Sequence, residues 1–315
     1  MNIHKIVIPT PYEIGDVNAF LVKGEALTLF DAGPKTQEAY DAIQWGIRAA
    51  GYSMRDVEQI ILTHHHPDHA GWVDAFPNAQ KLAHPYVDHW LRKEQSFLDY
   101  HRAFYRQELA FQGVPKELID KIIHVRGEIE LFGSTPLTGF INDGDEVPGH
   151  PNLGAMHLPG HAQSHLIFYD ERTGEGITGD MLLPNSPSNP LVEPPVDLSM
   201  ERPKSLVQYV DSLKKMYKLK PKKLYVGHGD EITDVTAVLK ERSNKHQYRA
   251  MKILALLDEP KTVFELSKII FPKIYLVYTG LTLSETLGKL DILETQGRVE
   301  KTLIDGVHYY KKISD

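Results

Sequence analysis

Four histidines and one aspartate fill five of the six positions 64–69, which read His-His-His-Pro-Asp-His. Imidazole nitrogens and carboxylate oxygens together are the ligands that zinc and similar divalent metals use in proteins. Residues 57–62 include a short apolar run with β-branched side chains, which is typical of a buried strand. Pro67 and Gly71 mark a turn after that strand. The sequence therefore predicts a metal site where a strand leaves the core.

Three further candidate ligands occur singly, and each follows a glycine at the end of a predicted strand. They are His161, Asp180 and His228. Any one of them alone is an ordinary turn residue, because glycine-flanked histidines and aspartates are common in turns. Three such residues at successive strand ends, after a dense histidine cluster, indicate loops that converge on one edge of the fold.

Composition limits the class of protein. The chain has 315 residues, 42% hydrophobic and 24% charged, which is typical of a soluble globular protein with room for two domains. A net charge of −7 favours neither nucleic acid nor a membrane surface as a partner. The absence of cysteine excludes disulfides, thiolate ligands and a cysteine nucleophile. The first residues lack the apolar run of a signal peptide, and no segment approaches the ~20 apolar residues of a transmembrane helix, so we expect a cytoplasmic address.

Short strands and helices alternate up to about residue 235. Amphipathic periodicity predicts helices at 36–50 and 200–219, and residues 184–203 form a proline-rich loop. The predicted strands are 3–9, 18–22, 26–30, 57–62, 81–83, 137–142, 153–158, 166–169, 176–178 and 223–226.

Residues 86–132 interrupt this pattern with an aromatic, helical insertion that Gly113 and Pro115 break into two pieces. Its aromatic rings can pack inward, or they can wall a substrate pocket above the metal site. The pocket candidates are Trp90, Phe97, Tyr100, Phe104 and Tyr105.

Residues 236–315 predict a second, small domain of three helices and a hairpin, the order found in a winged helix. Thr262 with Glu265 and Thr282 with Glu285 have the spacing of capping boxes, and Asp305-Gly306 is typical of a type I′ turn. The third predicted helix, 283–297, carries one lysine against three carboxylates. A helix that enters a nucleic-acid groove is expected to be basic, so packing, dimerisation or covering the active-site rim is favoured for this segment.

Over about residues 3–235 the chain resembles the metallo-β-lactamase superfamily, and within it the glyoxalase II-like hydrolases with two metals. Five features carry this resemblance: Asp31, the cluster 64–69, Gly160-His161, Gly179-Asp180 and Gly227-His228. The resemblance implies an α+β fold, an αββα sandwich with the metals at one edge. It therefore implies a catalytic domain over 1–235, including the helical insertion, followed by the winged-helix-like domain over 236–315.

The resemblance also implies a role for each candidate residue. It places His64, His66 and His161 on the first metal, Asp68, His69 and His228 on the second, Asp180 as the bridge and Asp31 behind a ligand histidine. Zinc is expected, with iron or manganese as alternatives. His65 and His165 are extra histidines, which we interpret as supporting or pocket residues rather than ligands.

Two metals held in this way lower the pKa of water toward ~7 and share a hydroxide nucleophile. Asp68 is placed to handle a proton. We expect a hydrolase that acts on a small ester-like substrate, either a thioester or a lactone; a phosphodiesterase or ribonuclease with the same site is the alternative. Glyoxalase II-like members often read Gly-His-Thr-Pro-Gly-His, whereas residues 160–165 of this chain read Gly-His-Ala-Gln-Ser-His. Because of this difference, we do not single out glutathione thioesters as the substrate. A small-molecule substrate and a homodimer fit this reading better than a nucleic-acid or membrane partner.

Overall fold

Two β-sheets form the main layers of the fold, and the first of them is built from the N-terminal part of the chain. The computed structural model describes residues 2–123, 127–197 and 199–313. In this sheet β1 to β3 pair antiparallel, and β3 to β6 pair parallel in sequence order. The strands are β1 Ile3–Ile8, β2 Val17–Lys23, β3 Leu27–Phe30, β4 Gln59–Ile61, β5 Gln80–Ala83 and β6 Gly139–Phe140. All six were predicted, although β6 is only two residues long and not six.

The second sheet has four strands in the order β10-β9-β8-β7. Strands β7 to β9 pair antiparallel, whereas β9 and β10 run parallel. They are β7 Gly154–His157, β8 Leu166–Asp170, β9 Glu175–Gly179 and β10 Lys223–Val226, close to the predicted ranges.

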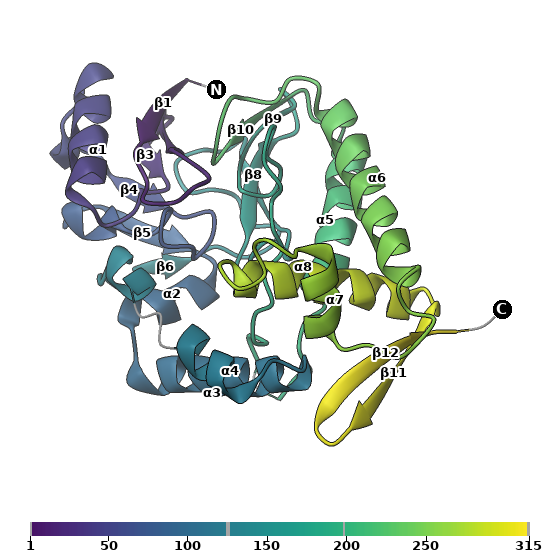
Figure 1. The fold of residues 1–315 in the computed structure, drawn as a ribbon. Coiled ribbons are helices and arrows are strands. Elements are labelled where there is room, and N and C mark those ends of the chain that lie inside the picture. The colour runs from purple at the N-terminus through teal and green to yellow at the C-terminus, as the bar shows by residue number, and fades with distance from the viewer. Residues whose placement is uncertain (1, 124–126, 198, 314–315) are drawn as a thin grey trace.

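The two sheets pack face to face and helices cover their outer faces, as Figure 1 shows. Apolar side chains from both sheets meet between them, and the rings of Phe30 and Phe168 lie 5.2 Å apart. Helix α1 (Gln37–Ala49) buries one apolar stripe against the first sheet. Helices α5 (Ser205–Leu219) and α6 (Val235–Leu254) lie beyond the second sheet. The predicted αββα sandwich is therefore confirmed.

The described residues of the insertion form three α-helices where two helical pieces were predicted. They are α2 Pro85–Arg92, α3 Gln95–Phe111 and α4 Lys116–Ile123. The additional break lies at Lys93, which ends α2 in the left-handed conformation with φ 51°. Short 3₁₀ helices lie at Met54–Asp56, Trp72–Ala75 and Gly127–Leu131. None of the helices in the described part of the chain is long and apolar enough to cross a membrane.

The C-terminal segment follows the predicted order of three helices and a hairpin. Its further elements are α7 Val263–Ile270, α8 Thr279–Thr295, β11 Val299–Ile304 and β12 Val307–Lys312. The capping box of Thr262 and Glu265 is confirmed, as is the turn at Asp305 and Gly306, where both residues have positive φ. The predicted cap at Thr282 is wrong. Helix α8 begins one turn earlier, and the buried Thr282 hydroxyl donates to the Thr279 carbonyl.

Helix α8 is buried along most of its length, and its charged side chains have partners inside the molecule. Lys289, which is fully buried, contacts Glu285 at 3.0 Å and the Nδ1 atom of His246 at 3.1 Å. Asp291 accepts two hydrogen bonds from Arg202. These charges thus serve contacts inside the molecule.

Acid is expected to weaken the folded state through His246, which faces Lys289 and the ring of Tyr209. Burial, then Lys289, Arg242 and Arg249, lower the pKa of this histidine to about 3 from 6.5. Below pH 6.5 this histidine binds a proton in the unfolded chain but stays neutral in the folded chain. The free energy of unfolding therefore falls progressively down to about pH 3. Between pH 6.5 and 5 the loss from this residue is about 2 kcal/mol.

Urea unfolding at pH 7.5 and pH 5.0 measures this effect. The loss of stability on acidification should be about 2 kcal/mol smaller in His246→Gln than in the unaltered protein. The same pH dependence in both proteins would contradict the assignment.

Candidate metal centre

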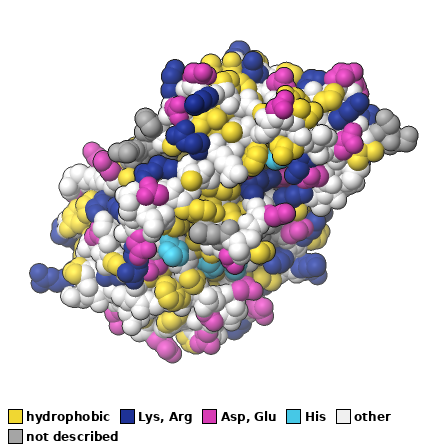
Figure 2. All heavy atoms as spheres, turned by 90° about the horizontal axis from the view of Figure 1, so that it is seen from below, with side chains coloured by type: hydrophobic (Ala, Val, Ile, Leu, Met, Phe, Trp, Pro, Cys, Tyr) yellow, Lys and Arg dark blue, Asp and Glu magenta, His cyan; other side chains and the backbone are white. Residues whose placement is uncertain are grey.

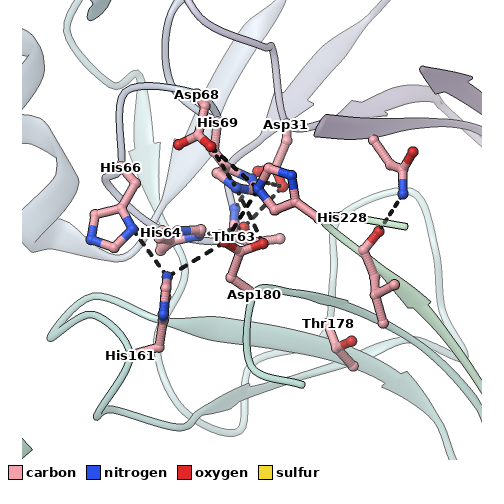
Figure 3. A network of polar contacts seen from close by, with 12 residues as sticks. Asp31, Thr63, His64, His66, Asp68, His69, His161, Thr178, Asp180 and His228 are labelled. Atoms are coloured by element: carbon pink, nitrogen blue, oxygen red, sulfur yellow. Dashed lines mark hydrogen bonds and ion pairs between the residues drawn. The ribbon is translucent and has the colours of Figure 1, made fainter. Parts of the chain in front are cut away.

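The candidate ligands come together at one edge of the sandwich, where four loops leave the strands. The loop after β4 brings residues 64–69 from the first sheet, and the loops after β7, β9 and β10 bring His161, Asp180 and His228 from the second. Figure 3 shows the side chains of all these loops pointing toward one another. The two sheets therefore contribute jointly to one site.

One group consists of His64, His66 and His161. The Nδ1 atom of His66 lies 3.0 Å from the Nε2 atom of His64 and 3.0 Å from the Nε2 atom of His161. Ligand atoms at about 2.0–2.1 Å from a tetrahedral zinc lie ~3.3 Å from one another. The three nitrogens are thus spaced as ligands of one metal would be.

A second group consists of Asp68, His69 and His228. The Oδ2 atom of Asp68 lies 3.3 Å from the Nε2 atom of His228 and 4.0 Å from the Nε2 atom of His69. The Nε2 atoms of both histidines are buried and have no hydrogen-bond partner among the described residues. Buried polar atoms without a partner are rare, and here they face the same small space, as a second metal would require.

Asp180 lies between the two groups. Its Oδ2 atom is 3.6 Å from the Nε2 atom of His161 and 3.5 Å from the Nε2 atom of His228, and its Oδ1 atom is 3.4 Å from the Nε2 atom of His69. The carboxylate therefore contacts histidines of both groups.

The charges of the two groups differ. Burial, reinforced by the neighbouring rings, lowers the pKa of His64 well below its usual value and that of His161 to about 3. Burial acts in the same direction on His69 and His228, but Asp180 and the other carboxylates outweigh it. They raise the pKa of His228 to about 10 and that of His69 well above its usual value. His64 and His161 are thus neutral, whereas the carboxylates of the other group favour positive charge on His69 and His228.

Hydrogen bonds behind the rings fix which nitrogen is free in three of the five candidate ligand histidines, His64, His69 and His228. Asp31 accepts from the Nδ1 atom of His69 at 2.8 Å, and the carbonyl of Asp16 accepts from the Nδ1 atom of His228 at 2.8 Å. The Nδ1 atom of His64 lies 2.9 Å from the Thr63 hydroxyl, which itself donates to Asp31. With Nδ1 protonated, the Nε2 lone pair of each ring is left to face the site.

Asp31 takes the position behind a ligand that the resemblance implies. It is buried, it has a positive φ of 62°, and it also accepts from the Thr63 backbone N–H. An aspartate tolerates this left-handed conformation better than most residues. One side chain thus connects the end of β3 to the loop that holds the histidine cluster.

Comparison with known proteins decides the family. The model of the metallo-β-lactamase superfamily matches residues 12–228, which is more than half of the chain. The chain belongs to the metallo-β-lactamase superfamily. A probable metallo-hydrolase of Bacillus subtilis (strain 168), YqjP, is 37% identical over 308 residues, which are 97% of this chain and 96% of the relative. Membership, this relative and the ligand groups together support a metallo-hydrolase.

Two solved structures are similar to this protein over nearly its whole length. A metallo-β-lactamase family protein from Thermus thermophilus, TTHA1429, is 28% identical with a TM-score of 0.80, and the match covers 99% of both chains. A β-lactamase domain protein from Burkholderia ambifaria is 20% identical with a TM-score of 0.78, and the match covers 99% of this chain and 93% of that one. The C-terminal segment therefore has a counterpart in both folds.

One residue beside the candidate ligands, Glu193, was not predicted from the sequence. It lies in the proline-rich loop 184–203, is buried, and contacts the Nε2 atom of His65 at 3.1 Å and that of His66 at 3.8 Å. A lone glutamate among prolines carries no periodic pattern or motif. Only its position in a loop between two predicted ligands, Asp180 and His228, could have pointed to it.

His65 and His165 both lie beside the ligands of the superfamily site. Both nitrogens of His65 have partners, since Nδ1 lies 2.8 Å from the Ser164 hydroxyl and Nε2 faces Glu193. His165 is fully buried and stacks on His64 with ring centroids 4.7 Å apart. These positions agree with supporting roles for the two rings.

The predicted pocket aromatics occupy different places in the insertion. Trp90 stacks on His65 with ring centroids 5.1 Å apart and nearly parallel planes, so it reaches the histidine loop. Phe97 packs edge-on against Trp90, and Tyr100 and Tyr105 pack around His101. Phe104 packs against the core that includes α5 and α8. The structure thus places Trp90 beside the metal centre and Phe104 against that core.

Alanine substitutions are expected to separate pocket rings from packing rings. Trp90→Ala should raise KM by about tenfold or more, because a ligand that buries an aromatic ring gains roughly 1.5–3 kcal/mol. Phe104→Ala, the matched control, should lower the melting temperature and leave KM unchanged. Steady-state kinetics and thermal melting of both variants, and of Phe97→Ala, Tyr100→Ala and Tyr105→Ala, make the comparison. If every substitution lowers stability and none changes KM, the rings wall no pocket.

Proposed function

We propose that the protein is a hydrolase that holds two divalent metal ions and acts on a small ester-like substrate. The position of Asp180 carries this proposal, since its carboxylate contacts histidines of both ligand groups. We assign one ion to His64, His66 and His161 and the other to Asp68, His69 and His228, with Asp180 shared.

The chemistry of the donors suits zinc, with iron and manganese as alternatives. All seven candidate ligands offer nitrogen or oxygen, and the chain has no cysteine to favour a softer metal. Bound metal ions would supply an activated water and would polarise a carbonyl oxygen at neutral pH. The residues fit the group, because three ring nitrogens of the first group converge at ligand spacing and the Nε2 atoms of His69 and His228 face the site without a hydrogen-bond partner among the described residues.

The chain's own residues would orient the ions and handle protons. Asp31, Thr63 and the Asp16 carbonyl keep the Nδ1 atoms of three ligands occupied. The Oδ2 atom of Asp68, 3.3 Å from His228, borders the shared space and is the group we assign to accept a proton from the attacking water and pass it on. The side chain of His66 is 17% exposed, which is more than the side chains of Asp68, His69, His161, Asp180 and His228. We therefore expect substrate to approach the site from the side of His66.

A thioester or a lactone is the substrate class that we favour, as in the glyoxalase II-like hydrolases. Figure 2 shows histidine side chains near the middle of one face with hydrophobic side chains beside them. The same face has acidic and basic side chains interspersed and not gathered into a basic patch. A partly apolar small molecule suits such a surface better than RNA does.

We also propose that residues 236–315 form a winged-helix-like domain that packs on the catalytic domain 1–235. The family match ends at residue 228, and helix, helix, helix and hairpin follow in that order. The buried charges of α8 support a packing role more than contact with nucleic acid. A homodimer remains our expectation for its assembly.

Metal analysis combined with a panel of substrates tests the proposal. Purified protein supplemented with zinc should contain two ions per chain and hydrolyse a thioester or a lactone. One ion per chain after supplementation would contradict the two-metal site. Cleavage of RNA or a phosphodiester, with thioesters and lactones untouched, would replace the ester-like substrate by the alternative.

A further inference from the structure

Glu193 is a buried carboxylate outside the proposed ligand set. Its side chain is 5% exposed, Oε1 lies 3.1 Å from the Nε2 atom of His65, and Oε2 accepts from the Gln163 backbone N–H at 2.8 Å. A buried charge is costly unless it is paired and hydrogen-bonded. Both oxygens of Glu193 have partners, and both partners lie within two residues of candidate ligands, His64 or His66 in one case and His161 in the other.

The same carboxylate faces the outer nitrogen of His66. The Nε2 atom of His66 is buried, lies 3.8 Å from Oε1 of Glu193 and has no hydrogen-bond partner among the described residues. At this distance the contact is electrostatic. His66 differs from the other ligands in presenting Nδ1 to the site, so the atom that must carry its proton is Nε2.

We propose that Glu193 is a positioning residue for the metal ligand His66, and that helix α8 holds the loop that carries Glu193. This inference rests on the proposed function. A carboxylate behind a ligating imidazole fixes the tautomer and orientation of the ring and raises its basicity. Glu193 thus stands behind His66 as Asp31 stands behind His69, but it acts through an electrostatic contact at 3.8 Å where Asp31 accepts a hydrogen bond at 2.8 Å.

His65 and Trp90 keep Glu193 at this position. Because Glu193 can only accept, the Nε2 atom of His65 donates to it, and the Nδ1 atom of His65 accepts from the Ser164 hydroxyl. Trp90 of α2 stacks flat on the His65 ring. The insertion thereby supports the side of the site that carries His65.

Helix α8 fixes the proline-rich loop on both sides of Glu193. The backbone N–H of Val192 donates to the Ser284 hydroxyl at 3.1 Å, immediately before Glu193. After it, Arg202 binds Asp291 with distances of 2.7 and 3.0 Å, and Lys204 binds Glu294 at 2.7 Å. The C-terminal segment is thus connected to a metal ligand through one short loop.

The first test replaces Glu193 by glutamine in the full chain and measures zinc affinity by competition with a chelator. We expect the affinity for one of the zinc ions to fall by about 10–100-fold, the usual cost of losing a partner behind a ligand. The absorption of cobalt bound in place of zinc should also shift, because His66 changes its orientation. Asp88→Asn is the matched control, since Asp88 is another buried carboxylate that accepts a backbone hydrogen bond, from Leu137, away from the metal centre.

The second test removes the α8 contact. Ser284→Ala should speed zinc transfer to the chelator severalfold and speed hydrogen exchange at the Val192 amide. Ser267→Ala is the control, because the buried Ser267 hydroxyl on α7 has no hydrogen-bond partner in the part of the chain that is described. It should change neither rate. Thermal melting of the metal-free proteins shows whether each variant is folded.

Two results would overturn the inference. In one, Glu193→Gln is folded and binds zinc as tightly as the unaltered protein, with the same cobalt spectrum. In the other, the unaltered protein binds a third zinc that Glu193→Gln lacks, which would make Glu193, His65 and His66 a ligand group of their own. If the protein hydrolyses no ester-like substrate and Glu193→Gln still loses zinc affinity, the proposed substrate class fails and the role of Glu193 is supported.

Discussion

Asp180→Ala is expected to abolish metal binding and hydrolysis together. The substitution removes a carboxylate that contacts both ligand groups, and it leaves His69 and His228 with Asp68 but without the acid that does most to raise the pKa of both rings. Losing a partner behind a ligand costs about 10–100-fold in affinity or activity, so losing a shared ligand should cost more than ~100-fold. Elemental analysis and activity measurements on the same preparation check both losses.

Asp170→Ala is the control for this prediction. Asp170 is also buried, but its carboxylate accepts from the backbone of Arg172 and Thr173 at the turn between β8 and β9. Its loss should lower the melting temperature and leave the metal content at two ions per chain. Two ions per chain in Asp180→Ala would refute the bridging role.

Gly227→Ala should disable the site almost as completely, although glycine offers no ligand. A Cβ atom at this position would lie 2.1 Å from the Oδ1 atom of Asp180 and 2.8 Å from the Cε1 atom of His69. The backbone cannot easily retreat, because Gly227 donates to the Gly179 carbonyl and accepts from the Asn18 N–H at 2.6 Å. The carboxylate must therefore move, and overpacking of this kind costs roughly 1–3 kcal/mol.

We expect the Gly227→Ala protein to be folded, with at least tenfold weaker zinc binding and hydrolysis reduced in proportion. Gly154→Ala is the matched control, since the nearest atom to its added Cβ is the Tyr169 carbonyl oxygen at 3.9 Å. Chelator competition and thermal melting of both variants give the answer. Unchanged zinc affinity in Gly227→Ala would show that the carboxylate can shift without loss, against the tight site described above.

The sequence predicted the family and the sandwich because the most informative residues are dense or regularly placed. The cluster 64–69 is local, and His161, Asp180 and His228 each follow a glycine at a strand end, so a pattern marks every candidate ligand. Glu193 was missed because its contacts with His65 and His66 join segments far apart in the chain, and nothing in its neighbours indicates a buried acid. Its partners could be known only once the loop was placed.

The errors in the C-terminal segment have a related cause. Thr282 and Glu285 have capping spacing, but the surroundings of Thr279 bury an extra turn and the helix begins there. Lys289 is a charged residue that is fully buried, because Glu285 and the ring of His246 accept hydrogen bonds from its ammonium group. Glu285 is one turn before Lys289 on the same helix, but His246 belongs to α6, so local propensity and composition cannot anticipate that second partner.

The candidate ligands come from both sheets, so bound ions would join the two sheets of the sandwich. An ion that binds only when the sheets are together stabilises that state by mass action. At a free concentration 1,000 times its dissociation constant, one such ion adds about 4.1 kcal/mol to the free energy of unfolding. The resistance of this protein to heat and proteases would then rise and fall with the metal supply of its surroundings.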